Sequence, residues 1–126
     1  MSGGITLDAG ALIALDRNDR RVVALITGAA ERGVPITIPA TALAQAIRNP
    51  ARQVRLTRLI RQPGTHLVHL DGPGATATGR LLAATRTTDI ADAHVVVCAR
   101  RAGQPVVTSD AADLRRLDSG LMLVEI

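Results

Sequence analysis

The stretch Ile5-Thr-Leu-Asp-Ala-Gly-Ala-Leu-Ile-Ala-Leu15 changes from a strand-like to a helix-like pattern at one acidic residue, Asp8. Residues 5–7 form a short apolar run, and residues 9–15 have the composition of a brief helix. Asp8 is therefore expected at the carboxyl end of a strand. Taken alone it is best explained as a helix cap, because an aspartate there accepts hydrogen bonds from free backbone N–H groups.

The same alternation of strand and helix patterns continues to the end of the chain. Further strands are predicted at 35–39, 66–70, 105–108 and 121–126, and further helices at 21–32, 41–48, 51–60, 72–85, 88–102 and 111–117. Strands that alternate with helices in this way are typical of a mostly parallel sheet covered by helices on both faces. We therefore expect one three-layer α/β/α domain over residues 1–126, with ligands at the carboxyl ends of its strands.

The composition restricts how this chain can contact nucleic acid. It has no Phe, Tyr or Trp, and its 15 basic residues are all arginine. An aromatic platform for stacking bases is therefore excluded, whereas arginine is well suited to phosphate groups and base edges. The formal net charge of +4 makes a polyanionic partner plausible.

The single cysteine and the three histidines give little sign of chemistry. Cys98 lies in the apolar run HVVVCA and is predicted to be a small buried residue rather than a nucleophile. His66, His69 and His94 have no metal-ligand spacing and are expected in packing or surface roles. We find no signal peptide or membrane-spanning pattern, so a cytoplasmic location is expected.

Two further acids fall near the start of the predicted helix TTDIADAHVVVCARR. Asp89 and Asp92 are three residues apart and so lie on one face of that helix. Thr88 or Asp89 suits a helix cap, with Asp92 favourably placed in the positive first turn. Asp92 is nevertheless the better candidate for a metal, because the apolar remainder of the helix would direct its carboxylate along the edge of the sheet.

Asp110 and Asp113, in the stretch PVVTSDAADL, repeat the arrangement of a strand, an acid and a helix. Ser109 or Asp110 could cap the helix, and Asp113 could complete a reciprocal cap. Taken together, the acids at these strand ends and at the helix start favour a shared acidic site over capping alone. The fold would bring three to five carboxylates close to one another. Such a cluster is usually neutralised by a divalent cation with oxygen ligands.

These segments resemble the PIN-domain ribonucleases, and specifically the toxin component of VapBC-type toxin–antitoxin pairs. The matching segments are LDAGALIAL, IPATALAQAIR, TTDIADAHVVVCARRAG and PVVTSDAADL, which together cover the chain from end to end. The resemblance implies an acidic site that binds Mg²⁺ or Mn²⁺ and cleaves RNA phosphodiester bonds. It assigns the metal to Asp8, Asp92 and Asp110, with Asp89 and Asp113 as secondary ligands or hydrogen-bond acceptors.

One position departs from the family pattern. PIN nucleases usually have a glutamate where this chain has Gln45. The amide oxygen can still ligate a hard cation or orient water, but it attracts the cation less and cannot act as a base. The departure bears on activity more than on fold, so the alternative is a non-catalytic PIN module that binds RNA or a protein partner. Thr6 and Ser109 are candidate polar neighbours of the site, although ordinary structural roles are favoured for both.

RNA contact would require positive charge, because a carboxylate cluster repels phosphate. Arg48, Arg52 and Arg55 recur at helical spacing and are predicted to form one row beside the site, although a solvated helix face explains the same pattern. Other classes that use a sheet-edge acid fit less well: the chain has no lysine for a phosphate-receiving domain and no glycine-rich phosphate loop. The resemblance also implies a homodimer and a small antitoxin partner.

Overall fold

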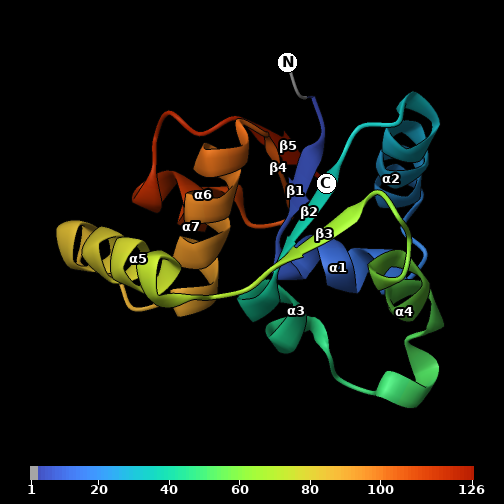
Figure 1. Cartoon of the computed structure of the whole chain (residues 1–126), viewed down its shortest axis with the longest axis horizontal. Coiled ribbons are helices and arrows are strands. Elements are labelled where there is room, and N and C mark those ends of the chain that lie inside the picture. Colours follow the sequence, from blue (N-terminus) through green and yellow to red (C-terminus); the bar gives the residue numbers. More distant parts are fainter. Residues whose placement is uncertain (1–2) are drawn as a thin grey trace.

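The five strands form a single, entirely parallel sheet in the computed structural model, which describes residues 3–126 (Figure 1). They are β1 (Ile5–Leu7), β2 (Ile36–Pro39), β3 (Thr65–Val68), β4 (Val106–Thr108) and β5 (Leu123–Glu125). Their order across the sheet is β3-β2-β1-β4-β5. The first strand of the chain is therefore the central strand of the sheet.

Helices cover both faces of this sheet and make three layers. They are α1 (Ala9–Asp16), α2 (Arg20–Arg32), α3 (Ala40–Ala46), α4 (Val54–Ile60), α5 (Gly72–Thr85), α6 (Ile90–Ala102) and α7 (Ala111–Leu117), with a 3₁₀ turn η1 at Pro50–Arg52. Figure 1 shows α5, α6 and α7 on one side of the sheet and α1, α2 and α4 on the other. The expected α/β/α architecture is confirmed.

Most predicted elements are present with shifts of one or two residues at their ends, but the helix predicted over 51–60 is wrong. That segment divides into η1 and α4, and the helix before it ends at Ala46 rather than Arg48. The backbone at Asn49 is not helical, as expected for a residue before proline. The Gln53 side chain stabilises this interruption of the helix, because its Oε1 accepts hydrogen bonds from the N–H groups of Arg48 (2.9 Å) and Asn49 (3.1 Å).

Helix α6 is the centre of the core. Its residues Ala93 to Ala99 are all buried, because it packs against the sheet and against α3, α5 and α7. A helical segment that is buried on every side, as this one is, is stable only inside a protein. Branched aliphatic side chains fill the rest of the core, including the fully buried Leu7, Leu12, Ile38 and Leu114. Within residues 3–126 no helix has the length and apolar character that crossing a bilayer requires.

The order of the strands fixes where a ligand site can form. From β1 the chain builds β2 and β3 on one side, and later β4 and β5 on the other, so the direction of winding reverses between β1 and β4. In open parallel sheets a crevice forms at this point, outside the carboxyl ends of the strands. Asp8 directly follows β1 and Asp110 lies two residues after β4, so both acids lie at the crevice.

We predict that Leu12→Ala, which truncates a side chain with 0% exposure in α1, lowers the free energy of unfolding by about 3 kcal/mol. The loss combines reduced apolar burial with the cavity left behind. Urea denaturation followed by circular dichroism at 222 nm measures it. Val54→Ala is the control, because Val54 is 52% exposed and its truncation should change stability by less than about 0.5 kcal/mol. Equal effects of the two substitutions would contradict this account of the core.

Candidate active site

Asp8 is buried at the junction of β1, α1 and β4, with only 3% of its surface exposed. Its Oδ1 accepts from the N–H of Ala11 at 2.8 Å, so the expected role as helix cap is confirmed. Burial raises the pKa of this carboxyl above its ordinary value, and nearby Asp110 adds to that effect. Hydrogen bonds from the Thr108 hydroxyl and from Ala11 act in the opposite direction.

Thr108 is a part of the site that the sequence did not indicate. This fully buried residue ends β4, and its hydroxyl lowers the pKa of the Asp8 carboxyl beside it. The same oxygen accepts from the N–H of Asp110 at 2.8 Å. Thr108 therefore connects Asp8 and Asp110 at the switch point, which is the place between β1 and β4 where the direction of winding reverses. The sequence alone shows only a threonine at the end of a strand.

Asp89 and Asp92 have different roles at the start of α6. Asp89 caps the helix, with its Oδ1 accepting from the N–H of Asp92 at 2.9 Å. Asp92 is half-buried, and its pKa is raised to about 7, first by burial and then by the negative charges of Asp89, Asp8, Asp113 and Asp110. A carboxyl that senses four others lies inside an uncompensated cluster of negative charge.

Asp110 and Asp113 interact with each other at the start of α7. A side-chain hydrogen bond with Asp113 is the main cause that raises the pKa of Asp110, followed by burial and by the charges of Asp113 and Asp89. Asp110 occupies the cap position of α7 without a side-chain capping bond, and its own N–H is bonded to Thr108. The reciprocal cap suggested by the sequence is therefore not formed.

The structure brings all five aspartates near one another, although not around one point. Asp89, Asp92 and Asp113 line a cleft of about 320 Å³, together with Arg86, Thr87, Thr88, Arg116 and Leu117. Asp8 and Asp110 act on Asp92 through their charge. Across residues 3–126, no three His, Cys, Asp or Glu side chains are close enough together to ligate a single ion. Asp8 and Asp89 are instead turned toward the N–H groups that they cap.

The other predicted site residues lie outside this cleft. Gln45 is exposed in the last turn of α3 and is not among the residues that line the cleft. Thr6 donates to the Oε1 of Gln104 at 2.8 Å and serves the interior. Ser109 packs its hydroxyl so closely against Gly10 that a side chain at position 10 would collide with it. A side chain at position 10 would therefore require the Ser109 hydroxyl to move.

The predicted single row of Arg48, Arg52 and Arg55 is wrong, because the helix that would carry it is broken. Arg48 follows α3, Arg52 lies in η1 and Arg55 lies in α4. Arg48 and Arg52 line a polar cleft of about 270 Å³ with Arg17. Arg55 instead lines a separate cleft of about 240 Å³ between α4 and α2. Whether any of the three binds RNA stays a prediction.

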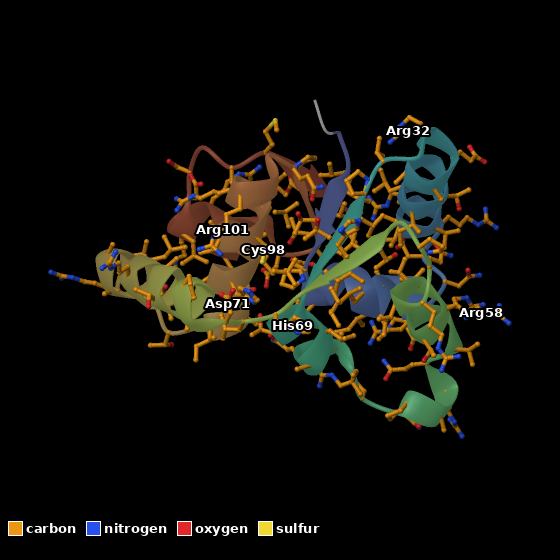
Figure 2. The ribbon with its side chains drawn as sticks, in the orientation of Figure 1. Arg32, Arg58, His69, Asp71, Cys98 and Arg101 are labelled. Atoms are coloured by element: carbon orange, nitrogen blue, oxygen red, sulfur yellow. The ribbon has the colours of Figure 1, made fainter. Side chains whose placement is uncertain are left out.

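Cys98 and the histidines have the structural roles expected of them. Cys98 is 5% exposed, and burial raises the pKa of its thiol to about 11, so it stays protonated and unreactive. Figure 2 shows it on α6 near Arg101 and near Asp71 at the start of α5. His94 is buried, with its Nδ1 bonded to the Thr41 hydroxyl at 2.7 Å, whereas His66 and His69 are exposed.

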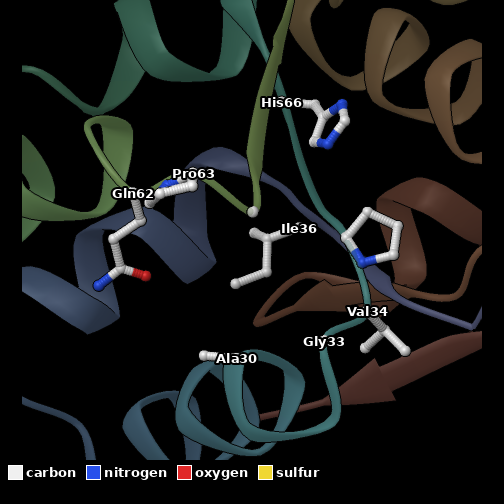
Figure 3. Close-up of a pocket in the computed structure, with 9 residues that line it drawn as sticks. Ala30, Gly33, Val34, Ile36, Gln62, Pro63 and His66 are labelled. Atoms are coloured by element: carbon white, nitrogen blue, oxygen red, sulfur yellow. The ribbon is translucent and has the colours of Figure 1, made fainter.

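A larger cavity, of about 530 Å³, lies at the opposite end of the sheet (Figure 3). It is formed by the end of α2 and the starts of β2 and β3, and its walls are mainly apolar. No acid lines it. The largest of these cavities and the cluster of aspartates therefore lie at different ends of the sheet.

The structure thus belongs to the class of three-layer α/β/α proteins that gather aspartates at the switch point of a parallel sheet. The PIN domain model matches residues 5–120, and the chain belongs to this family. The resemblance noted in the sequence is therefore confirmed at the level of the family.

Solved structures agree with this assignment at low sequence identity. DNA-bound VapBC from Salmonella typhimurium superposes with a TM-score of 0.70 at 18% identity, covering 99% of this chain and 98% of that one. Mycobacterium tuberculosis VapC20, described as a sarcin–ricin loop cleaving toxin, gives 0.69 at 16% identity, covering 97% and 99%. FitAcB from Neisseria gonorrhoeae gives 0.67 at 17% identity, covering 96% of each chain. Such identities show a common fold. No curated protein sequence matches this chain significantly.

The raised pKa of Asp92 predicts how stability depends on pH. Between its ordinary pKa and about 7, folded Asp92 retains a proton that the unfolded chain has lost, so stability falls as pH rises through this range. We therefore expect Asp92→Asn to raise the Tm at pH 8 but not at pH 4. Thermal denaturation in EDTA, followed by circular dichroism, tests this.

Asp118→Asn supplies a control of opposite sign. Burial raises the pKa of Asp118, but hydrogen bonds from Arg100 and the Gly120 N–H outweigh it and leave the pKa lowered. Its stabilising contribution is thus present above the unfolded pKa and is lost in acid. Asp118→Asn should therefore lower the Tm at pH 8. A gain at pH 8 from both substitutions would indicate a general charge effect and refute the assignment to Asp92.

Proposed function

We infer that this protein is a metal-dependent ribonuclease of the kind that serves as the toxin in toxin–antitoxin pairs. The observation that carries this proposal is the gathering of aspartates from separate segments at the switch point of the sheet. Capping explains the direction of Asp8 and Asp89. It does not explain why Asp92 and Asp110 are placed where other carboxylates raise their pKa values.

The donor chemistry of the cluster fits a divalent cation such as Mg²⁺ or Mn²⁺. All its ligands would be carboxylate oxygens, which these ions prefer, and the uncompensated charge felt by Asp92 is the charge that a cation neutralises. Asp8, Asp92 and Asp110 would hold the ion, with Asp89 and Asp113 as outer partners. When bound, the ion supplies positive charge to the phosphodiester and acidifies an attacking water.

The chain's own residues prepare this chemistry in three ways. Thr108 fixes the spacing between the segments that carry Asp8 and Asp110. Asp92 holds a proton near neutral pH and must release it when a cation binds. Gln45 in α3 would orient water or substrate through its amide, since it cannot accept a proton as a glutamate would.

The structural neighbours support an RNA substrate and an antitoxin partner. One is described as a toxin that cleaves the sarcin–ricin loop, and others were solved as VapBC or FitAB complexes with DNA. By analogy we assign to this chain a small antitoxin partner and a homodimeric state. Exposed apolar side chains such as Ile47, Val54, Ile90 and Met122 offer surface for such contacts.

The second candidate function is a PIN module that binds RNA or a protein without cleaving it. It is favoured by Gln45 in place of the usual glutamate and by the orientation of Asp8 and Asp89 toward helix caps. Both candidates share the fold, so the dependence on metal separates them.

We expect the purified protein to cleave single-stranded RNA in Mn²⁺ or Mg²⁺ and to be inactive in EDTA. Asp92→Asn should lower the cleavage rate by at least about a hundredfold, because it removes one charged ligand of the ion. Gel analysis of labelled RNA measures cleavage. Asp19→Asn is the control, because Asp19 caps α2 outside the cleft. If wild-type protein is inactive with either metal and Gln45→Glu restores cleavage, the enzyme proposal fails and the binding module is supported.

The same titration predicts the pH dependence of metal binding. Because a cation must displace the proton held by Asp92, affinity for Mn²⁺ should rise between pH 6 and pH 8. Isothermal titration calorimetry in two buffers of different ionisation enthalpy should also detect proton release. An affinity that does not change over this range would place the ion away from Asp92.

A further inference from the structure

Two arginines share the cleft with the acids at the start of α6. Arg86, in the loop between α5 and α6, and Arg116, in α7, line the cleft of about 320 Å³ that also contains Asp89, Asp92 and Asp113. Neither was a candidate site residue on sequence grounds. Their position next to the acids calls for a physical explanation.

The backbone conformation of Arg86 is the first observation. Three helices of this chain end in the left-handed conformation: α2 at Gly33 (φ 67°), α6 at Gly103 (φ 64°) and α5 at Arg86 (φ 55°). All three ends share one motif, in which the residue after the cap donates to a carbonyl five residues earlier. Glycine adopts this conformation without strain, whereas a residue with a Cβ does not. The chain thus carries an arginine where its two equivalent ends carry glycine.

The loop around Arg86 is held in place by its neighbours. The Thr85 hydroxyl donates to the carbonyl of Leu81 at 2.8 Å and bonds to the Thr87 hydroxyl at 2.9 Å. The N–H of Thr87 donates to the carbonyl of Leu82 at 3.1 Å. Arg86 is therefore presented from a fixed backbone, which lowers the entropy lost when its side chain binds a ligand.

Arg116 is the second observation. The ion pairs found within residues 3–126 are Arg100–Asp118 at 2.9 Å and Arg115–Glu125 at 3.4 Å. Arg115 and Arg116 are neighbours in α7, yet the first is paired with β5 and the second lines the cleft. Arg86 and Arg116 take part in neither pair, although acids line the same cleft.

The charges in the cleft are therefore separated rather than neutralised. Arg86 and Arg116 line the cleft without forming an ion pair with Asp89, Asp92 or Asp113 in the part of the chain that the structure describes. The lining of the cleft thus combines three acids with two arginines that belong to neither of these ion pairs, a pattern that suits a ligand carrying several negative charges.

We propose that Arg86 and Arg116 bind backbone phosphates of the RNA strand on either side of the phosphodiester presented to the acids. This proposal rests on the proposed ribonuclease function and names the residues that hold its substrate. Arginine is suited to the task, because its planar fork donates two hydrogen bonds to one phosphate. The acids repel the strand, and the two arginines offset that repulsion beside them.

Binding of a labelled single-stranded RNA of mixed sequence, measured by fluorescence anisotropy in EDTA, tests the proposal without requiring cleavage. We expect Arg116→Gln and Arg86→Gly each to weaken binding roughly tenfold, the effect of removing a charge-assisted hydrogen bond. The slope of log Kd against log salt should fall by about 0.7 for each phosphate that no longer has an arginine partner. Arg80→Gln is the matched control, because it removes the same charge from an exposed position in α5 that does not line the cleft.

Arg86→Gly also separates binding from folding. Glycine relieves the left-handed conformation, so the Tm of this variant should equal or exceed that of wild type while RNA binding weakens. A purely structural role would give unchanged binding. The proposal is overturned if wild type does not bind RNA, if both variants bind as wild type does, or if Arg80→Gln weakens binding equally.

Cleavage assays keep this result distinct from the ribonuclease proposal. If wild type cleaves RNA in Mn²⁺, both arginine variants should raise KM more than they lower kcat, since they act on binding. Cleavage with an unchanged KM in both variants would overturn the arginine assignment and leave the nuclease intact. Arginine-dependent binding without any cleavage would support the assignment while refuting the nuclease.

Discussion

The hydrogen bonds that hold Asp8 at the carboxyl end of β1 are the constraint on which the rest of the site depends. A carboxylate with 3% exposure needs polar partners: Ala11 in the first turn of α1 donates a hydrogen bond to it, and the Thr108 hydroxyl at the end of β4 lowers its pKa. The same contacts therefore join the central strand, its helix and the neighbouring strand. Because Thr108 also accepts from the N–H of Asp110, the position of one acid sets that of the other.

Much of this fold follows from the sequence, because alternating apolar runs leave few possible topologies. The helix predicted over 51–60 failed for a reason outside such patterns. The side chain of Gln53, which is buried, makes the hydrogen bonds of the loop after α3, and a glutamine with that role looks like any other glutamine in a sequence. Secondary structure was thus predicted most reliably where the periodicity of apolar residues determines it. It was predicted least reliably where the hydrogen bonds of one polar side chain determine it.

The site was predictable in its acids but not in their surroundings. Strand ends indicated Asp8 and Asp110, since parallel strands bring their carboxyl ends to one edge. Nothing in the sequence indicated that Thr108 would link them, because its partners lie in other segments. The arginines of the cleft were equally hidden, as both belong to loops or helix faces whose direction depends on how α5, α6 and α7 pack.

The position of β1 also determines when this site can exist. β1 leaves the ribosome before the other four strands of the sheet, yet one of its two neighbours, β4, begins only at Val106. Contacts between such distant segments form slowly, because a long loop must close before any stabilisation is gained. Asp8 can meet Thr108 and Asp110 only after β4 and the residues that follow it have been synthesised. A nascent chain interrupted before β4 therefore contains Asp8, Asp89 and Asp92 but lacks Thr108, Asp110 and Asp113, so its acidic site is incomplete.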